Sequence, residues 1–503
     1  MKIGIIGAGV AGLASAVRMA SRGHEVHVFE ANSYAGGKLS EFTLYKKGGN
    51  SSKSDENTEG YRFDAGPSLF TMPQYVEDLF KVAKVDMKGR FDYLKSDVVC
   101  QYFWDDDTRL TAYFDQDKFA QEVENKLNIK QDVVKKALAK AEKKYDEVGQ
   151  IFLEKSLHKP KTWFSSKIAK AMFLMPTYDI FKTMNRTHVQ LLEHPKLVQY
   201  FNRFATYNGS NPYKASGMLS VIPHFEHGIG CFYPIGGMYE ITKSIYNLAI
   251  EKGVKFHFNS PVEEILTEQK RIKGLKIKEL DSIFYCDKVI SNMDIYFTYK
   301  KLLPKEKHPN YILNQERSTS ALIFYWGIKH DFKELHLHNI FFSEDYKNEF
   351  DHLAKNTVSD DPTVYVNISS KLTPTDAPEG CENWFVMVNV PHNSGQDWDA
   401  LIQKTRANVI QKLSTILKQN ISKLIDVEET LTPLSIESKT QSFSGALYGT
   451  SSNSLMSAFL RHKNFSTDVN GLFFCGGSVH PGGGIPLCLL SAKIVEDVMF
   501  AEN

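Results

Sequence analysis

A glycine motif near the start of the chain constrains the fold more than any other feature of the sequence. Residues 2–6, which are apolar from Ile3 onward, predict a buried parallel strand, and residues 12–21 predict the helix that follows it. Between them stands Gly-Ala-Gly-Val-Ala-Gly, residues 7–12, and a second predicted strand, 25–29, ends next to Glu30. This order of strand, glycine turn, helix, strand and acidic residue is typical of a Rossmann βαβ unit that binds a dinucleotide.

Each residue of the motif has a physical role in such a site. Gly7 permits the tight turn, Gly9 lets a pyrophosphate approach the backbone, and Gly12 lets the helix pack against the strand. Ala11 belongs to the same predicted binding turn, whose helix amino end faces the phosphates. We expect Glu30 to accept hydrogen bonds from the adenosine ribose, and its charge would repel the extra phosphate of NADP.

Bulk composition excludes several classes of protein. A chain of 503 residues predicts two or three domains, and a net charge of +1 gives no field that would attract nucleic acid, so we expect no nucleic-acid partner. The six cysteines lack CxxC pairs and metal-ligand spacing, which predicts reduced thiols of a cytosolic protein and no metal site. No apolar stretch has the length of about eighteen residues that a transmembrane helix needs.

Periodicity divides the rest of the chain. Residues 46–60 offer no apolar side chain to bury and predict a mobile surface loop, whereas 117–197 have a helical texture. The other predicted strands are 254–258, 272–277, 288–291, 322–327, 363–368, 384–389 and 472–475, and the other predicted helices are 402–418 and 487–499.

Two further segments indicate which dinucleotide is bound. Gly36, Gly37 and Lys38 follow Glu30, and Asp-Ala-Gly-Pro, residues 64–67, follows the predicted loop. This pattern resembles the two-dinucleotide-binding FAD superfamily, which includes amine oxidases and carotenoid desaturases. The resemblance implies FAD as the cofactor, with Gly66 and Pro67 in its site. That superfamily usually has arginine after the paired glycines, so Lys38 is a departure that affects a phosphate or flavin contact.

The same superfamily is matched in the middle and at the end of the chain. Val262, in the segment 260–265, matches the residue whose backbone contacts the adenine. The segment 475–487 supplies several glycines directly before a helix, which brings backbone amides and a positive helix end to the flavin ring. From this segment we predict cofactor contacts for Gly476, Gly477, Gly483, Gly484 and Ile485.

The resemblance becomes more specific at the C-terminal segment. Ser-Val-His-Pro-Gly-Gly-Gly-Ile-Pro-Leu, residues 478–487, closely resembles the signature of bacterial phytoene desaturase-type carotenoid desaturases, and 64–72, 232–238 and 287–294 are similar to that family too. The family oxidises a carbon-carbon single bond in a long polyene, with a hydride passing to flavin N5 and a proton leaving the neighbouring carbon. The resemblance therefore implies a flavin-dependent desaturase of an acyclic carotenoid.

The resemblance to these flavoproteins also implies an α/β architecture of the amine oxidase type. We expect a Rossmann-like FAD-binding domain in three pieces, a substrate-binding domain built on a mixed sheet, and a helical subdomain that faces a membrane. The predicted ranges are 1–85, 220–300 and 465–503 for the first, 86–115 and 301–464 for the second, and 116–219 for the third.

Several readings of the activity stay open. Gly-Gly-Lys-Leu, residues 36–39, is more similar to the subgroup that acts on hydroxylated or methoxylated acyclic carotenoids, which favours 3,4-desaturation of a 1-hydroxycarotenoid over desaturation of phytoene. A redox-neutral carotenoid isomerase is a rival from another reaction class. A non-enzymatic prenyl-binding protein, similar to Rab GDP dissociation inhibitors, is a second. Oxygen and a membrane quinone both remain candidates for the electron acceptor.

No acid-base residue is marked by a motif. His480, beside the predicted flavin loop, is a candidate for proton transfer, with a structural hydrogen bond as the alternative, and Arg203 is a weaker candidate whose alternative is a salt bridge.

Passage of a carotenoid of about forty carbons through water would cost on the order of 30 kcal/mol, so transfer from the bilayer is expected. The aromatic and lysine-rich segment 163–176 predicts peripheral contact at the inner face of the membrane, with a core-facing helix as the alternative.

Overall fold

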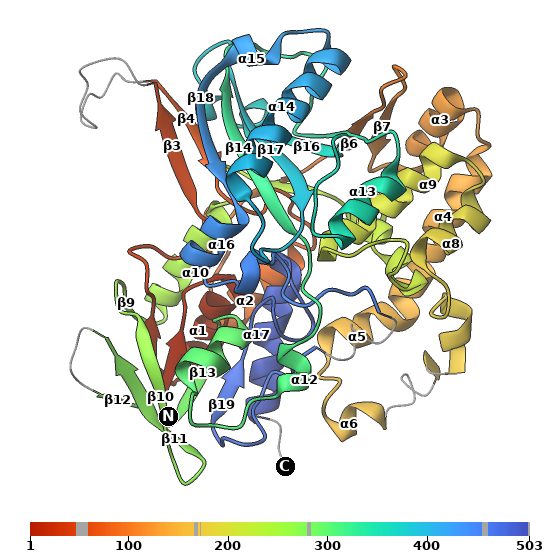
Figure 1. Cartoon of the computed structure of the whole chain (residues 1–503). Coiled ribbons are helices and arrows are strands. Elements are labelled where there is room, and N and C mark those ends of the chain that lie inside the picture. Colours follow the sequence, from red (N-terminus) through yellow and green to blue (C-terminus); the bar gives the residue numbers. More distant parts are fainter. Residues whose placement is uncertain (47–58, 165–169, 172, 279–282, 455–460, 501–503) are drawn as a thin grey trace.

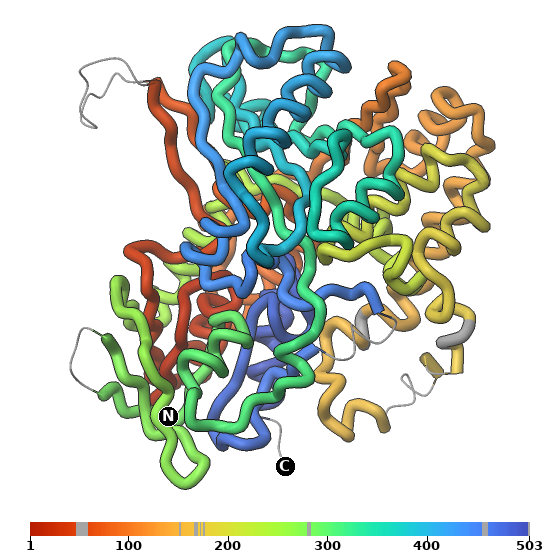
Figure 2. Tube along the Cα trace, viewed as in Figure 1, coloured from red at the N-terminus to blue at the C-terminus, as the bar shows by residue number. Residues whose placement is uncertain are grey.

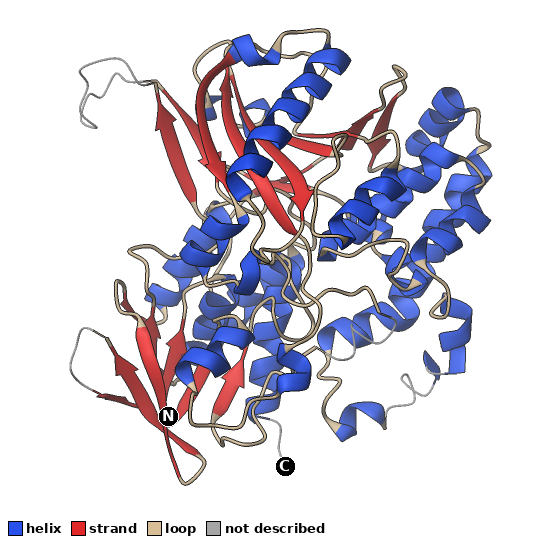
Figure 3. Ribbon diagram, in the orientation of Figure 1, coloured by secondary structure: helices blue, strands red, loops and turns tan. Residues whose placement is uncertain are grey.

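The computed structural model describes residues 1–46, 59–164, 170–171, 173–278, 283–454 and 461–500 (Figure 1). Most of the predicted surface loop, residues 47–58, lies outside these ranges. Two sheets organise the chain, one in the lower half of the view and one in the upper half (Figure 3).

The glycine motif belongs to a five-stranded parallel sheet of order β19-β13-β1-β2-β9. Its central strand has fully buried Ile3 and Ile5 on the face covered by helices, whereas Ile6 packs on the other face against Ile265 and Leu275 of the small sheet at residues 262–285. Helices α1, α2, α10 and α17 contribute to the core on one side of it. The strands are β1 (Lys2–Ile6), β2 (Glu25–Phe29), β9 (Lys255–His257), β13 (Lys288–Ser291) and β19 (Leu472–Phe474), and the helices are α1 (Val10–Ser21), α2 (Gln74–Ala83), α10 (Glu240–Glu251) and α17 (Ile485–Phe500).

The predicted βαβ unit is confirmed, with one shift. Strands β1 and β2 have the predicted bounds and pair in parallel. Helix α1 begins at Val10, two residues earlier than predicted, because Gly9 already serves as its N-cap and its carbonyl accepts from the Leu13 amide. Figure 2 shows the first, middle and last parts of the chain side by side in this body.

The second sheet has seven strands in the order β18-β14-β17-β16-β15-β6-β7. Only the β15 to β6 pairing is parallel. Every residue of β14 is buried: Phe324 and Trp326 pack toward helix α14 (Trp398–Leu417), and Ile323 and Tyr325 pack toward the hairpin β3–β4. The bounds are β3 (Glu41–Tyr45), β4 (Gly60–Asp64), β6 (Val98–Phe103), β7 (Arg109–Tyr113), β14 (Ser320–Ile328), β15 (His338–Phe341), β16 (Val364–Ile368), β17 (Glu382–Val390) and β18 (Ile425–Leu431).

The helical region packs directly on this second sheet. Side chains of its helices share one buried cluster with residues of β6, β7 and β15, including Phe119, Tyr200, Phe201 and Tyr102. The main helices are α3 (Gln116–Leu127), α4 (Gln131–Lys144), α8 (Met184–Leu192) and α9 (Pro195–Asn202), with shorter turns at η3 (Arg203–Asn208) and η5 (Phe225–Ile229).

The strands of the two sheets fall into the predicted sequence ranges. All strands of the parallel sheet lie within 1–85, 220–300 and 465–503, and all strands of the seven-stranded sheet lie within 86–115 and 301–464. We therefore propose those ranges, with 116–219 as the helical part, as the domain division. Smaller pairings join β5 (Tyr93–Lys95) to β8 (Phe232–Pro234) and link β10 (Val262–Glu268), β11 (Arg271–Ile277) and β12 (Ile283–Tyr285).

Candidate functional site for a dinucleotide and an apolar substrate

One cavity of about 1670 Å³ extends from the glycine motif to the seven-stranded sheet and the helical region. Its volume exceeds the roughly 300–1,000 Å³ of an ordinary ligand pocket, which leaves room for two ligands in contact. Glu30 and Val262 line it on the side of the parallel sheet, and Arg203 and Ile340 line it on the side of the second sheet.

All predicted cofactor residues except Gly12 line this cavity. A Cβ at Gly12 would stand 2.1 Å from the carbonyl oxygen of Gly7, so a side chain there would clash with the backbone directly after β1; this geometry fits the proposal that Gly12 lets the helix pack against the strand. The residues that line the cavity are Gly7, Gly9, Ala11, Glu30, Gly36, Gly37, Lys38, Gly66, Pro67, Val262, Gly476, Gly477, Gly483, Gly484 and Ile485.

The start of helix α1 fits a pyrophosphate. Gly9 caps the helix without a side-chain hydrogen bond, so the amides of the first turn are not occupied by a capping side chain. The Gly36 amide donates to the carbonyl of Ala8 at 2.9 Å, which holds the paired glycines against the turn. A Cβ at Gly36 would stand 2.1 Å from the carbonyl oxygen of Leu39, and Gly37 has a φ of 58° beside Gly9, so both positions favour glycine. The paired glycines therefore place only backbone beside these amides.

Glu30 is held rigidly at the end of β2. One carboxylate oxygen accepts from the amide of Ala8 at 2.7 Å, and the other accepts from the amide and side chain of Asn32, both at 2.9 Å. A carboxylate offers about four acceptor positions, so these three donors leave capacity for a ribose hydroxyl. Glu30 is buried and lines the cavity, which fits the predicted contact.

Replacing Glu30 by alanine is expected to lower FAD affinity about tenfold, because a charge-assisted hydrogen bond to the ribose and the support of the Ala8 amide are both lost. The measurement is a fluorescence titration of the apoprotein with FAD. Glu25→Ala, at the exposed start of the same strand, is the matched control. Unchanged flavin affinity in Glu30→Ala would contradict the assigned role.

The C-terminal glycines form the second half of the predicted cofactor site. We call this site the FAD cradle; it consists of the turn at Gly7 and Gly9, the pair Gly36 and Gly37, the pair Gly66 and Pro67, and the loop 476–484. A Cβ at Gly484 would meet no protein atom within 4 Å, so open space lies directly before helix α17. Buried Arg461 donates to the carbonyls of Tyr448 at 3.0 Å and Thr450 at 2.9 Å and lies 3.5 Å from the carbonyl oxygen of Gly477, so it links this loop to residues 448–450. A helix amino end beside open space suits the negative charge of a reduced flavin. The residues present therefore fit FAD.

Lys38 joins the cradle to the opposite wall. Its Nζ donates to the carbonyl of Leu447 at 3.0 Å, and burial lowers the pKa of Lys38 while the charge of Asp294 opposes that shift. Burial also raises the pKa of Asp294. Lys38 stands where the superfamily usually has arginine, and it uses one of its hydrogen-bond donors on the protein backbone.

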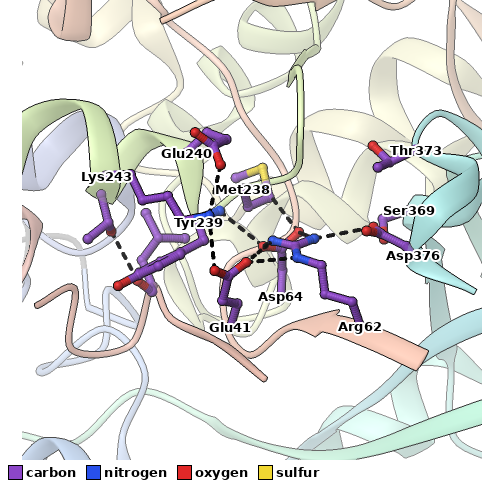
Figure 4. Close-up of polar contacts among 12 residues, drawn as sticks. Glu41, Arg62, Asp64, Met238, Tyr239, Glu240, Lys243, Ser369, Thr373 and Asp376 are labelled. Atoms are coloured by element: carbon purple, nitrogen blue, oxygen red, sulfur yellow. Dashed lines mark hydrogen bonds and ion pairs between the residues drawn. The ribbon is translucent and has the colours of Figure 1, made fainter. Parts of the chain in front are cut away.

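An ion cluster positions the segment that contains Gly66 and Pro67 (Figure 4). Arg62 pairs with Asp64 at 2.8 Å, with Glu41 at 2.7 Å and with Asp376 at 3.2 Å. Asp64 also accepts from the amides of Met238 at 2.9 Å and Tyr239 at 3.0 Å, just before helix α10. The cluster therefore ties the hairpin β3–β4 to both the parallel sheet's helix and the second sheet's loop.

The two predicted acid-base candidates have different surroundings. His480 is buried, and its Nε2 lies 2.9 Å from the carbonyl oxygen of Lys155. It is not among the described residues that line the cavity, so its placement favours the structural alternative. Arg203 does line the cavity, and it forms the salt bridge named as its alternative, to Glu226 at 2.5 Å.

Several cavity residues were missed by the sequence analysis. Tyr448 packs against Gly483, and Tyr207, Glu226 and His338 line the cavity near Arg203. None of them stands in a recognisable motif. They come from η3, η5, β15 and a loop before the last strand, and only tertiary packing brings them together.

The comparison with known families fits this architecture. The model of the family described as flavin containing amine oxidoreductase matches residues 10–495. The chain belongs to this family, and its cofactor is FAD.

Individual relatives narrow the comparison. The chain is 46% identical over 500 residues to the 1-hydroxycarotenoid 3,4-desaturase of Flavobacterium sp., covering 99% of both chains. It is 30% identical over 518 residues to a 4,4'-diapophytoene desaturase of Staphylococcus aureus, covering 100% of this chain and 99% of the relative. The solved structure of cyclohexylamine oxidase from Brevibacterium oxydans covers 99% of this chain and 98% of its own, with 14% identity and a TM-score of 0.60. That structure supports the fold alone.

Proposed function

We propose that the protein is an FAD-dependent carotenoid desaturase, with 3,4-desaturation of a 1-hydroxycarotenoid as its favoured reaction. The observation that carries the proposal is the single cavity that joins the FAD cradle to an apolar chamber. The full-length similarity to a 1-hydroxycarotenoid 3,4-desaturase supports the substrate class.

The chain's own residues supply binding and orientation. Leu69, Val99, Ile340, Phe385 and Met387 line the chamber, and their side chains suit a polyene that offers no polar handle along its length. FAD, when bound, supplies the hydride acceptor for the oxidation. Placing one carbon-carbon bond beside the cofactor is therefore the main task of the protein.

Product analysis tests the proposal. The purified FAD-loaded protein is incubated with a 1-hydroxylated acyclic carotenoid or with phytoene, and products are separated by chromatography and weighed by mass spectrometry. Loss of two hydrogens from the hydroxylated substrate supports 3,4-desaturation, whereas loss only from phytoene supports phytoene desaturation. An unchanged mass with a changed retention time indicates the isomerase, and a chain that takes up no FAD indicates the prenyl-binding alternative. Parallel reactions with oxygen or a quinone identify the electron acceptor.

We also propose that the protein contacts the inner face of the membrane through the predicted segment 163–176 together with the nearby Phe181. Phe164, Phe173 and Phe181 are 88%, 84% and 75% exposed, which supports burial in a lipid interface. Residues 165–169 and 172 of this stretch lie outside the described residues. Among the helices that the structure describes, none is both long and apolar enough to cross a bilayer.

Replacing Phe164, Phe173 and Phe181 together by alanine is expected to reduce vesicle binding at least tenfold, because each substitution removes apolar surface that would be buried in the lipid interface. The measurement is cosedimentation with vesicles of phosphatidylglycerol. A matched control replaces the exposed aromatic residues Tyr45, Tyr285 and Tyr311 by alanine. Equal losses in both triple variants would argue against this segment as the membrane contact.

A further inference from the structure

A group of polar side chains lines the chamber beyond the FAD cradle, and Arg203, Glu226 and His338 among them are buried. Arg203, Tyr207, Glu226, His338 and Tyr365 all face the cavity. The side chains of Arg203 and Glu226 are 8% and 2% exposed and lie 2.5 Å apart, and the Tyr207 hydroxyl donates to the other oxygen of Glu226. A buried ion pair is seldom more stable than apolar side chains of the same volume, so a chamber for pure hydrocarbon gains little from it.

The tautomer of His338 follows from its neighbours. Asn367 donates through its side-chain Nδ2 to the carbonyl of Leu337 at 3.0 Å, which fixes the orientation of the amide. The same nitrogen lies 3.2 Å from Nδ1 of His338, so Nδ1 is the acceptor of that contact. Burial lowers the pKa of His338 to about 4, which keeps the ring neutral. Its proton is therefore on Nε2.

Two N–H donors of this group are left unpaired. Nε2 of His338 and Nε of Arg203 are buried and have no hydrogen-bond partner among the described residues. His338, Glu226 and Arg203 line the same cavity, and the charges of Glu226 and Arg203 act on the His338 ring. A hydroxyl accepts hydrogen bonds from N–H groups and donates one to a carboxylate, whereas a hydrocarbon does neither. The group thus has the donors and the acceptor that one hydroxyl requires.

The group also lies near the reacting region. The Tyr365 hydroxyl is 2.8 Å from Nδ1 of His338 and 2.8 Å from the hydroxyl of Ser68, which follows Pro67 of the FAD cradle. His338 is therefore two hydrogen bonds from that cradle. In a 1-hydroxycarotenoid the oxygen is four bonds from C4, so a hydroxyl site for 3,4-desaturation has to lie beside the cofactor.

We infer that Arg203, Tyr207, Glu226 and His338 bind the terminal hydroxyl group of the substrate and select hydroxylated over hydrocarbon end groups. This inference rests on the proposed carotenoid function and adds the determinant of substrate choice. A hydrocarbon end group in the same place leaves buried donors without partners, which a hydroxyl prevents.

Equilibrium binding tests the inference separately from turnover. The FAD-loaded protein is titrated with a 1-hydroxylated acyclic carotenoid and with the same carotenoid lacking the hydroxyl, both in phosphatidylglycerol vesicles, and tryptophan quenching reports binding. We expect the hydroxylated ligand to bind about tenfold to a hundredfold more tightly. If the protein desaturates the carotenoid but binds both ligands equally tightly, the hydroxyl-site inference is overturned and the desaturase proposal stands. If it binds the hydroxylated ligand more tightly but does not desaturate it, the desaturase proposal is overturned and the hydroxyl site stands.

Paired substitutions locate the site. The double variant Arg203→Met with Glu226→Met removes both charges together and is expected to reduce the preference to about twofold or less. The matched control, Arg18→Met with Glu496→Met, removes another buried ion pair that does not line the cavity, and it should keep the wild-type preference. If the first double variant does not fold, Tyr207→Phe removes one hydroxyl and should lower the preference severalfold. Wild-type preference in a folded variant of either kind overturns the assignment.

Discussion

The variant Arg62→Met is expected to lower the free energy of unfolding by about 3–5 kcal/mol. The guanidinium is the shared partner of Glu41, Asp64 and Asp376, and the last two have side chains only 5% and 2% exposed. Methionine keeps the apolar stem and removes the charge, so the buried carboxylates face one another without their cation. The loss is therefore electrostatic in origin.

Chemical denaturation of holoprotein and apoprotein measures this loss. Arg90→Met is the matched control, because Arg90 pairs with Glu251 where both side chains are about half exposed, and exposed pairs contribute about 0–1 kcal/mol. FAD occupancy should fall in Arg62→Met as well, since Asp64 precedes the segment of Gly66 and Pro67. Equal stability losses in the two variants would refute the role of the cluster.

The sequence predicted those helices and strands whose pattern of residues lies within one short segment. Strands β1 and β2 were predicted with their exact bounds and helix α1 within two residues, because Gly7, Gly9 and Gly12 mark the turn itself. Strands β14, β16 and β17 were predicted within two residues, since their apolar runs are long. The order of the seven-stranded sheet was not predictable, because it depends on pairings between segments far apart, such as β6 with β15.

The same distinction holds for the site. Most of the cofactor residues occupy contiguous glycine-rich motifs, and all of the predicted ones except Gly12 line the cavity. The polar group around Arg203 is scattered instead: Glu226 lies in a short helical turn, and His338 lies in a strand of the second sheet. Each taken alone resembles an ordinary buried polar residue. Arg203, Glu226 and His338 line one cavity only because the helical region packs on the seven-stranded sheet.

Acid pH is expected to destabilise the protein strongly between about pH 6.5 and pH 4. Burial lowers the pKa of five histidines to about 4: His188, His227, His338, His462 and His480. In the unfolded chain histidine titrates near pH 6.5, so the unfolded state binds more protons throughout this interval. Their stabilising contribution is complete above about pH 6.5 and is lost as pH falls through the folded pKa, up to about 3 kcal/mol for each ring.

A single variant separates these rings from the buried carboxyls, which act in the opposite direction. Burial raises the pKa of Glu349, Glu382 and Asp294, so their protonation favours the folded state as pH falls. His227→Gln removes one titrating ring, and the slope of unfolding free energy against pH should decrease by up to about 1.4 kcal/mol per pH unit between pH 6 and pH 4.5. The comparison uses slopes, because glutamine also changes the contacts to Tyr200 and Tyr113. Identical slopes in variant and wild type would show that His227 titrates alike in the folded and unfolded states.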